Sequence, residues 1–325
     1  MKPVKLFPKI KPYRHGYLNV GDGHKLYYEL CGNPKGKPLL YLHGGPGAGC
    51  DENSRRFFNP KVWNIILFDQ RGAKRSKPFG SLRANTTWKL VSDMRQLLKF
   101  LNIKKAFLFG GSWGSTLALV YAIKHPETVT GMLLRGIFLG RKEDIMYTYD
   151  GGAEDYFPDA WERFVGNVPV RSRNDVIGYY VRQMRSKNRR MSNKFAFEFA
   201  YYELSLLKLN MTHRDVMKIM GKASSHPGHK SMAIIESYYM KKGCFLPKDY
   251  ILNNIGRIRK LKIPVAIVQG RYDVICPPYQ AWQLHKALPE SRLVFAISGH
   301  GSGDPNLTVK LVEEMKRMEK IVRPS

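Results

Sequence analysis

The sequence predicts an α/β protein: a doubly wound, mostly parallel β-sheet with a helical cap domain inserted into it. Three observations support this fold class. Short apolar runs alternate with helical patterns along most of the 325 residues. Hydrophobic residues make up 43% of the chain, which is enough for a packed core. The alternation stops over residues 141–255, where helical spacing continues but no strong strand pattern occurs.

The strand candidates are continuous and β-rich, as is typical of strands buried on both faces of a parallel sheet. A hairpin comes first, with strands at 17–20 and 26–29 joined by Gly-Asp-Gly. The parallel strands are then expected at 38–42, 63–68, 106–109, 131–134, 265–268 and 293–297. A helix is expected to start near Asn85, with apolar residues at helical spacing up to Leu101. It completes a βαβ unit.

The chain is expected to divide into a core, residues 1–140 and 256–325, and a helical cap, residues 141–255. The insertion follows the sixth strand, so it should cover the carboxyl ends of the strands. Ligands bind at that edge in open α/β sheets. The cap is therefore expected to take part in substrate recognition.

Charge is the unusual feature of the composition: 54 Lys and Arg against 26 Asp and Glu give +28. The excess is spread along the chain, with two short basic stretches, 71–77 and 182–190. Neither lies in a recognisable nucleic-acid scaffold, so a solvated basic surface is favoured over a dedicated nucleic-acid site. No apolar run is long enough to span a membrane, no secretion signal is visible and the four cysteines lack CxxC spacing. A soluble cytoplasmic protein without a membrane partner is expected.

The motif Gly110-Gly-Ser112-Trp-Gly114 stands between an expected strand and an expected helix. A serine on such a sharp strand-to-helix turn is a nucleophile elbow, and small neighbours are needed because the turn leaves no room for larger side chains. Ser112 is therefore the candidate nucleophile.

A serine hydroxyl needs a base, and the base needs an orienting carboxylate. Asp273 and His300 each follow an expected strand, in the order Ser, Asp, His that accompanies a nucleophile elbow. The other histidines lie at the hairpin, at helix ends or in the insertion. Ser112, Asp273 and His300 are the predicted catalytic triad.

Acyl transfer also needs hydrogen-bond donors for the developing oxyanion. The backbone N–H of Trp113, directly after the nucleophile, is one candidate. Gly45 N–H, in the loop His43-Gly-Gly-Pro-Gly47, is the other, because glycines let the main chain approach a substrate closely. His43 itself is expected to hold the loop through a structural hydrogen bond.

Taken together, the motifs resemble the proline iminopeptidase family of α/β-hydrolase-fold serine exopeptidases, which release an N-terminal proline. The resemblance runs from residue 12 to His300. The residues that carry it are HGGPG at 43–47, DQRG at 69–72 with Arg75-Ser76, GGSWGS at 110–115, LRGIF at 134–138, GRYD at 270–273 and Gly299-His300.

The resemblance implies a reaction without metal or organic cofactor, on peptides that carry a free N-terminal proline. It also implies that Glu203 and Glu236 of the cap bind the substrate's cationic amine. Both stand in apolar or aromatic sequence, where an unpaired carboxylate is costly. Arg135 is expected to pair with these carboxylates. Phe138, Tyr149 and Cys276 are expected to line the proline pocket.

Three positions depart from the family pattern: Lys74 in the DQRG loop, Met240 and Ile275. Lys74 is expected to alter the shape or charge of its loop, and Met240 and Ile275 leave open a preference for other small or apolar N-terminal residues. Seven acids and no base occupy residues 143–162, and we expect this acidic island to make the cap entrance negative or neutral.

Two alternatives to the exopeptidase hypothesis stay open. One is an esterase or amidase of the same fold that ignores a free amine. The other is a basic nucleic-acid or anionic-surface binder with dispensable catalysis.

Overall fold

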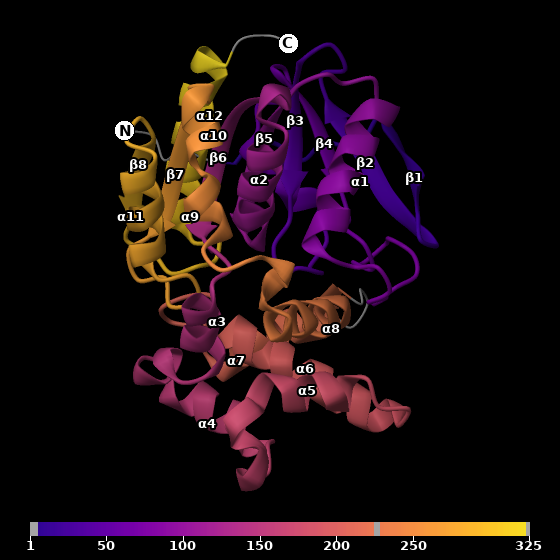
Figure 1. The fold of residues 1–325 in the computed structure, drawn as a ribbon, viewed down its shortest axis with the longest axis vertical. Coiled ribbons are helices and arrows are strands. Elements are labelled where there is room, and N and C mark those ends of the chain that lie inside the picture. The colour runs from indigo at the N-terminus through magenta and orange to yellow at the C-terminus, as the bar shows by residue number, and fades with distance from the viewer. Residues whose placement is uncertain (1–5, 224–227, 323–325) are drawn as a thin grey trace.

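The computed structural model describes residues 6–223 and 228–322, and its centre is one eight-stranded sheet. Neighbouring strands follow the order β1-β2-β4-β3-β5-β6-β7-β8 (Figure 1). Strands β3 to β8 run parallel, and β2 is antiparallel to both β1 and β4. The bounds are β1 Arg14–Gly21, β2 His24–Gly32, β3 Lys37–Leu42, β4 Trp63–Phe68, β5 Ala106–Ser112, β6 Val129–Ile137, β7 Val265–Gly270 and β8 Arg292–Ala296. The predicted fold class is confirmed.

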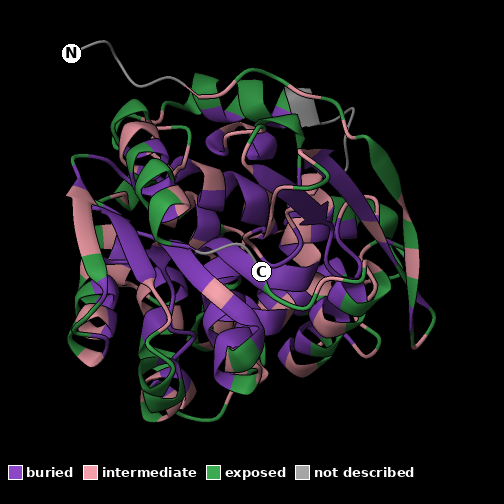
Figure 2. Ribbon diagram, turned by 90° about the horizontal axis from the view of Figure 1, so that it is seen from above, coloured by how far each residue is buried: buried purple, intermediate pink, exposed green. Residues whose placement is uncertain are grey.

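Helices cover both faces of this sheet. Alternate strand residues enter two separate apolar clusters, one beneath α1, α2 and α11 and the other beneath α12. This explains the continuous apolar runs, because a strand covered on both faces has no polar side. Figure 2 shows the buried strands enclosed by helices with exposed outer surfaces. The helices are α1 Thr87–Phe100, α2 Trp113–Lys124, α9 Tyr250–Asn254, α10 Gly256–Lys260, α11 Pro278–Ala287 and α12 Pro305–Ile321, with short 3₁₀ turns η1 Glu52–Phe57 and η2 Pro126–Thr128.

The segment between β6 and β7 forms a helical layer beyond the ends of the strands, on one side of the core (Figure 1). Its described residues contain no strand. Aromatic rings fill its interior, including Phe164 stacked between Tyr180 and Tyr202 at 4.4 Å from each. Its elements are α3 Lys142–Tyr149, η3 Gly152–Asp155, α4 Pro158–Gly166, η4 Val170–Asp175, α5 Val176–Met184, α6 Arg189–Ser205, α7 His213–Ala223, α8 Gly228–Lys241 and η5 Gly243–Phe245.

Each expected strand occurs in the structure, and most of the observed strands extend beyond the apolar run that predicted them. Strand β6 begins two residues earlier and ends three residues later than its apolar run. Strand β8 ends at Ala296, the last residue paired with β7. Ile297 follows with 71% of its surface exposed, so its inclusion in the strand was wrong. Apolar character marks a strand's centre, whereas pairing with the neighbour decides its ends.

The first basic stretch of the sequence is not a surface patch. Arg71 is buried and forms a two-bond ion pair with Asp93 at 2.7 and 2.8 Å. Arg75 likewise forms a two-bond ion pair with Asp69, at 2.6 and 3.0 Å. These cations stabilise loops of the core. Residues 182–190 are different, because their cations are exposed on α5 and α6.

No helix among the described residues has the length and apolar character required to cross a membrane.

Candidate active site

Ser112 stands at the junction of β5 and α2, at the carboxyl edge of the sheet. Its φ of 57° and ψ of −128° place a non-glycine residue in a strained backbone conformation. A Cβ atom at Gly110 would lie 2.2 Å from the carbonyl oxygen of Gly114, and one at Gly114 would lie 2.1 Å from that of Leu42. Both glycines are therefore needed for the turn that exposes the serine.

Asp273 and His300 meet behind this turn. His300 Nδ1 lies 2.8 Å from Asp273 Oδ2, and both residues are buried. The other oxygen of Asp273 accepts hydrogen bonds from the backbone N–H groups of Ile275 and Cys276 at 3.1 and 2.8 Å. Since an ionised carboxylate only accepts hydrogen bonds, the ring proton lies on Nδ1 and Nε2 presents its lone pair.

Gln269, the penultimate residue of β7, fixes the orientation of Asp273. Its Nε2 donates to Asp273 Oδ2 at 3.1 Å and to the Cys276 carbonyl at 2.8 Å, while its Oε1 accepts from Ile137 N at 2.9 Å. The sequence reasoning missed this residue, because nothing in the local pattern distinguishes it from any other strand residue.

Arg135, near the end of β6, is the direct neighbour of His300. Its Nη1 lies 3.2 Å from His300 Nε2 and donates to the His300 carbonyl at 2.8 Å. Burial raises the pKa of the nearby Cys276 thiol well above its usual range.

The loop after β3 brings backbone donors to the same place. Gly45 has a φ of +99°, a conformation that favours glycine, and lines the cavity that holds Ser112. Trp113 is the first residue of α2, so its N–H has no acceptor within the helix. The two predicted oxyanion donors thus lie in backbone positions suited to that role.

Gln70 connects these two segments and was not singled out from the sequence, although it belongs to the DQRG motif. Its side chain donates to the His43 carbonyl at 2.9 Å and accepts from the Trp113 indole at 3.0 Å. Its backbone N–H donates to His43 Nε2 at 2.9 Å. Burial lowers the pKa of His43 to about 4. The neutral ring has the structural role that we expected.

The cap supplies a pair of buried carboxylates. Tyr149 donates a hydrogen bond to Glu203 on α6 and lies 3.3 Å from Oε1 of Glu236 on α8. Glu236 Oε2 has no hydrogen-bond partner among the described residues. Burial raises the pKa of Glu203 to about 7, and burial together with the nearby Glu203 charge raises that of Glu236 well above its usual range. A bound cation would stabilise both in their ionised forms.

One cavity of about 520 Å³ connects the nucleophile with these carboxylates. The predicted residues on its wall are Gly45, Ser112, Arg135, Glu203, Glu236 and His300. The remaining wall is largely apolar, with Leu207, Met211, Ile219 and Met232.

Some expected positions differ from those in the structure. Phe138, Tyr149 and Cys276 are buried and do not line this cavity. Arg135 forms no ion pair with Glu203 or Glu236, because both carboxylates face Tyr149 and the guanidinium faces His300.

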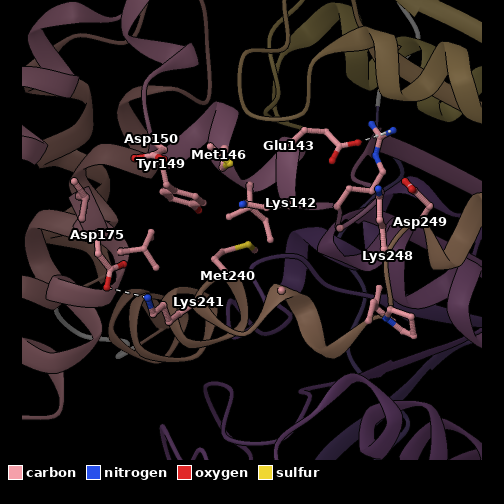
Figure 3. Close-up of a pocket in the computed structure, with 18 of the residues that line it drawn as sticks. Lys142, Glu143, Met146, Tyr149, Asp150, Asp175, Met240, Lys241, Lys248 and Asp249 are labelled. Carbon is pink, nitrogen blue, oxygen red and sulfur yellow. Dashed lines mark hydrogen bonds and ion pairs between the residues drawn. The ribbon is translucent and has the colours of Figure 1, made fainter. Parts of the chain in front are cut away.

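The acidic island lies away from the Ser112 cavity. None of its seven acids lines that cavity. Glu143 and Asp150 instead line a second cavity of about 740 Å³, together with Met240 and the ion pair of Asp175 and Lys241 (Figure 3). Charge along the sequence could not predict which way α3 faces.

The unusual Lys74 turns away from the nucleophile. Its φ is +41°, and its ammonium group donates to the Cys50 carbonyl at 2.7 Å. Ile275 is buried, and its main chain binds Asp273 and Thr148.

Known proteins resemble this chain in sequence and in fold. Residues 37–305 match the family model of the α/β hydrolase fold. The chain is 43% identical over 315 residues to a probable proline iminopeptidase of Leptolyngbya boryana, covering 96% of each chain. It is 41% identical over 320 residues to a proline iminopeptidase of Arabidopsis thaliana, covering 98% of this chain and 83% of the relative.

Solved structures show the same fold at lower identity. Proline iminopeptidase from Mycobacterium smegmatis aligns with a TM-score of 0.58 at 15% identity, over 95% of this chain and all of that one. A 2-hydroxy-6-oxo-6-phenylhexa-2,4-dienoate hydrolase from Rhodococcus aligns with a TM-score of 0.64 at 16% identity, over 95% and 99% of the two chains. Given the sequence relatives, the chain belongs to the proline iminopeptidase family of α/β hydrolases and is an enzyme of the hydrolase class.

Proposed function

We propose that the protein is a serine aminopeptidase that releases an N-terminal proline from peptides through an acyl-enzyme on Ser112. The observation that carries the proposal is the buried pair of Glu203 and Glu236 in the wall of the Ser112 cavity. Two buried carboxylates without a cationic partner are costly, and a substrate ammonium supplies that partner. The curated relatives are named proline iminopeptidases, which supports the same reaction.

In the proposed mechanism, the carboxylate pair holds the amine of the first residue and places its carbonyl carbon at Ser112. His300 Nε2 takes the hydroxyl proton as Ser112 Oγ forms the new C–O bond. Asp273 holds the ring in the required tautomer through the 2.8 Å contact with Nδ1. The N–H groups of Gly45 and Trp113 stabilise the tetrahedral oxyanion.

His300 then protonates the leaving amine as the C–N bond breaks, and the shortened peptide departs. Water, deprotonated by His300, attacks the ester carbonyl. The C–Oγ bond then breaks as His300 returns the proton to Ser112 Oγ, and free proline departs. Each step uses side chains or backbone groups of this chain and water.

A free and a blocked amine separate this function from that of an ordinary amidase or esterase. A proline arylamide should be hydrolysed at least about 100-fold faster, as kcat/KM, than its N-acetylated form, because the acetylated nitrogen carries no charge to pair with the buried carboxylates. Equal rates on the two substrates would contradict an exopeptidase.

The Ser112→Ala variant tests the nucleophile. It should lose hydrolysis of the proline arylamide while keeping the wild-type circular dichroism spectrum and melting temperature, since alanine removes only a hydroxyl group at the junction of β5 and α2. The Ser302→Ala variant, in the same cavity wall, is the matched control and should retain activity. Retained turnover in Ser112→Ala would overturn the assignment.

A further inference from the structure

We propose that Arg135 binds the free C-terminal carboxylate of the residue that follows the scissile bond, so that prolyl dipeptides are the preferred substrates. The inference rests on the proposed function and adds a second recognition site at the opposite end of the substrate.

Arg135 is a half-buried cation that pairs with no acid among the described residues. Its polar contacts are the two to His300, both made by Nη1. Two buried arginines elsewhere in the described chain have an acidic partner: Arg71 pairs with Asp93, and Arg141 pairs with Asp144. A desolvated guanidinium usually has an anionic partner, and in the Ser112 cavity a substrate can provide it.

The free edge of Arg135 has the geometry that binds carboxylates. In the pairs of Arg71 with Asp93 and of Arg141 with Asp144, Nε and Nη2 each donate to one carboxylate oxygen, at 2.7 to 2.9 Å. The same two atoms of Arg135 have no hydrogen-bond acceptor among residues 6–223 and 228–322. This bidentate edge is therefore available to a ligand.

Gly111 holds the guanidinium in place. A Cβ atom at Gly111 would lie 2.6 to 2.8 Å from Nη2, Nε and Cζ of Arg135, nearly the same distance from all three. The glycine next to Ser112 therefore leaves room for the Nε and Nη2 side of the guanidinium, where a larger residue would contact it.

The position of Arg135 favours a short substrate. Its Nη1 is 3.2 Å from the histidine nitrogen that must receive the Ser112 proton, so the guanidinium lies within one residue length, about 3.5 Å, of the reacting groups. A carboxylate at that distance from the scissile bond belongs to the next residue, which is the C-terminal residue only in a dipeptide.

The charged groups in the cavity wall match a zwitterion. Glu203 and Glu236 take the ammonium group, and Arg135 takes the carboxylate. Met211, Ile219 and Met232 in the same wall favour an apolar side chain on the second residue. Prolyl-leucine is therefore the natural probe.

The test compares prolyl-leucine with prolyl-leucine amide, which differ only in the C-terminal charge. The wild-type enzyme should prefer the free acid by about tenfold or more in kcat/KM, the effect of one charge-assisted bidentate contact. Arg135→Gln should bring the ratio of the two kcat/KM values close to one. Arg135→Lys keeps the charge without the bidentate edge and should retain an intermediate preference.

Lys208→Gln is the matched control, because it removes another cation from the same cavity wall. It should leave the ratio within about twofold of wild type. If Lys208→Gln lowers the ratio as far as Arg135→Gln does, the preference arises from the general positive charge of the cavity wall. That result would overturn the proposal. A wild-type ratio near one, or a ratio unchanged in Arg135→Gln, would also overturn it.

Binding to the Ser112→Ala variant gives a readout that needs neither turnover nor a folded Arg135 variant. Calorimetry should show tighter binding of prolyl-leucine than of its amide, and equal affinities would refute the carboxylate contact. If the proposed function fails, neither dipeptide nor the arylamide is hydrolysed. If only this inference fails, all three are hydrolysed and the free acid has no advantage over its amide.

Discussion

The indole Nε1 of Trp113 donates a hydrogen bond to Gln70 Oε1 at 3.0 Å, and the same glutamine donates to the His43 carbonyl at 2.9 Å. The amide thus ties the residue after the nucleophile to the loop that carries Gly45. Because the two proposed oxyanion donors come from different segments, we expect their separation to depend on this link.

Gln70→Met should lower kcat for a proline arylamide by about 10- to 100-fold with a smaller change in KM, because the donors lose alignment with the transition state. It should also lower the free energy of unfolding by about 1–3 kcal/mol for each buried group left without a partner. Steady-state kinetics and urea denaturation measure the two effects.

Gln280→Met is the control for a buried amide outside the site, since Gln280 Oε1 accepts only from Leu139 N, at 2.9 Å. It should lose stability and keep kcat. A Gln70→Met variant that behaves in the same way would show that the link has no catalytic effect.

The acid limb of the pH profile should depend on Tyr149. A protonated Glu203 cannot balance the substrate's ammonium charge, so kcat/KM should fall as the pH drops below about 7, the value to which burial raises the pKa of Glu203. The hydrogen bond from Tyr149 opposes that rise. Removing it in Tyr149→Phe should raise the pKa further and move the acid limb to higher pH.

Tyr202→Phe provides the comparison. The Tyr202 hydroxyl donates to the Thr148 carbonyl at 2.7 Å and makes no hydrogen bond to either carboxylate. Its loss should leave the acid limb in place. If the acid limb of the kcat/KM profile of Tyr149→Phe lies at the wild-type pH, the proposed titration of Glu203 is contradicted.

Glu203→Gln should stabilise the protein at alkaline pH. A carboxyl whose folded pKa lies above its unfolded value contributes its full stability below the unfolded pKa, and loses it as the pH rises through the folded pKa. For Glu203 that window runs from 4.5 to about 7. The variant should therefore exceed wild type at pH 8 by on the order of 3 kcal/mol and converge with it near pH 4.

Urea denaturation at pH 4, 6 and 8 measures this difference. Glu198→Gln, on the same helix, has the opposite expectation at pH 8, because Glu198 is ion-paired with Arg163 at 2.8 Å. A Glu203→Gln variant that is less stable than wild type at pH 8 would show that the ionised carboxylate is well solvated or paired.

Gly136 leaves the space that His300 occupies. A Cβ atom there would lie 2.9 Å from His300 Cε1, and the φ of +54° disfavours any other residue. Gly136→Ala should therefore displace the imidazole and lower kcat by about 100-fold. Gly140→Ala imposes similar backbone strain at φ +71°, with no atom closer than 3.4 Å, and should cost stability without a comparable loss of kcat. Equal activities of the two variants would exclude this steric role.

The chain's local patterns predicted the sheet, the helical layer and the turn at Ser112. Apolar runs locate strand centres because a strand buried on both faces contains few polar residues. The nucleophile elbow can be recognised because its glycines lie close to the serine in the sequence. The order of Asp273 and His300 after two strands predicted that they would meet, since the carboxyl ends of parallel strands share one edge. The structure places them 2.8 Å apart.

Tertiary structure alone decided which distant groups share hydrogen bonds. The family resemblance implied that Tyr149 lines the proline pocket, whereas in the structure its hydroxyl lies between Glu203 of α6 and Glu236 of α8. Likewise, Arg135 faces His300 instead of those carboxylates, and the acidic island faces another cavity. The physical reason is that a hydrogen bond depends on the position and direction of two groups to within a fraction of an ångström, which spacing along the chain does not encode.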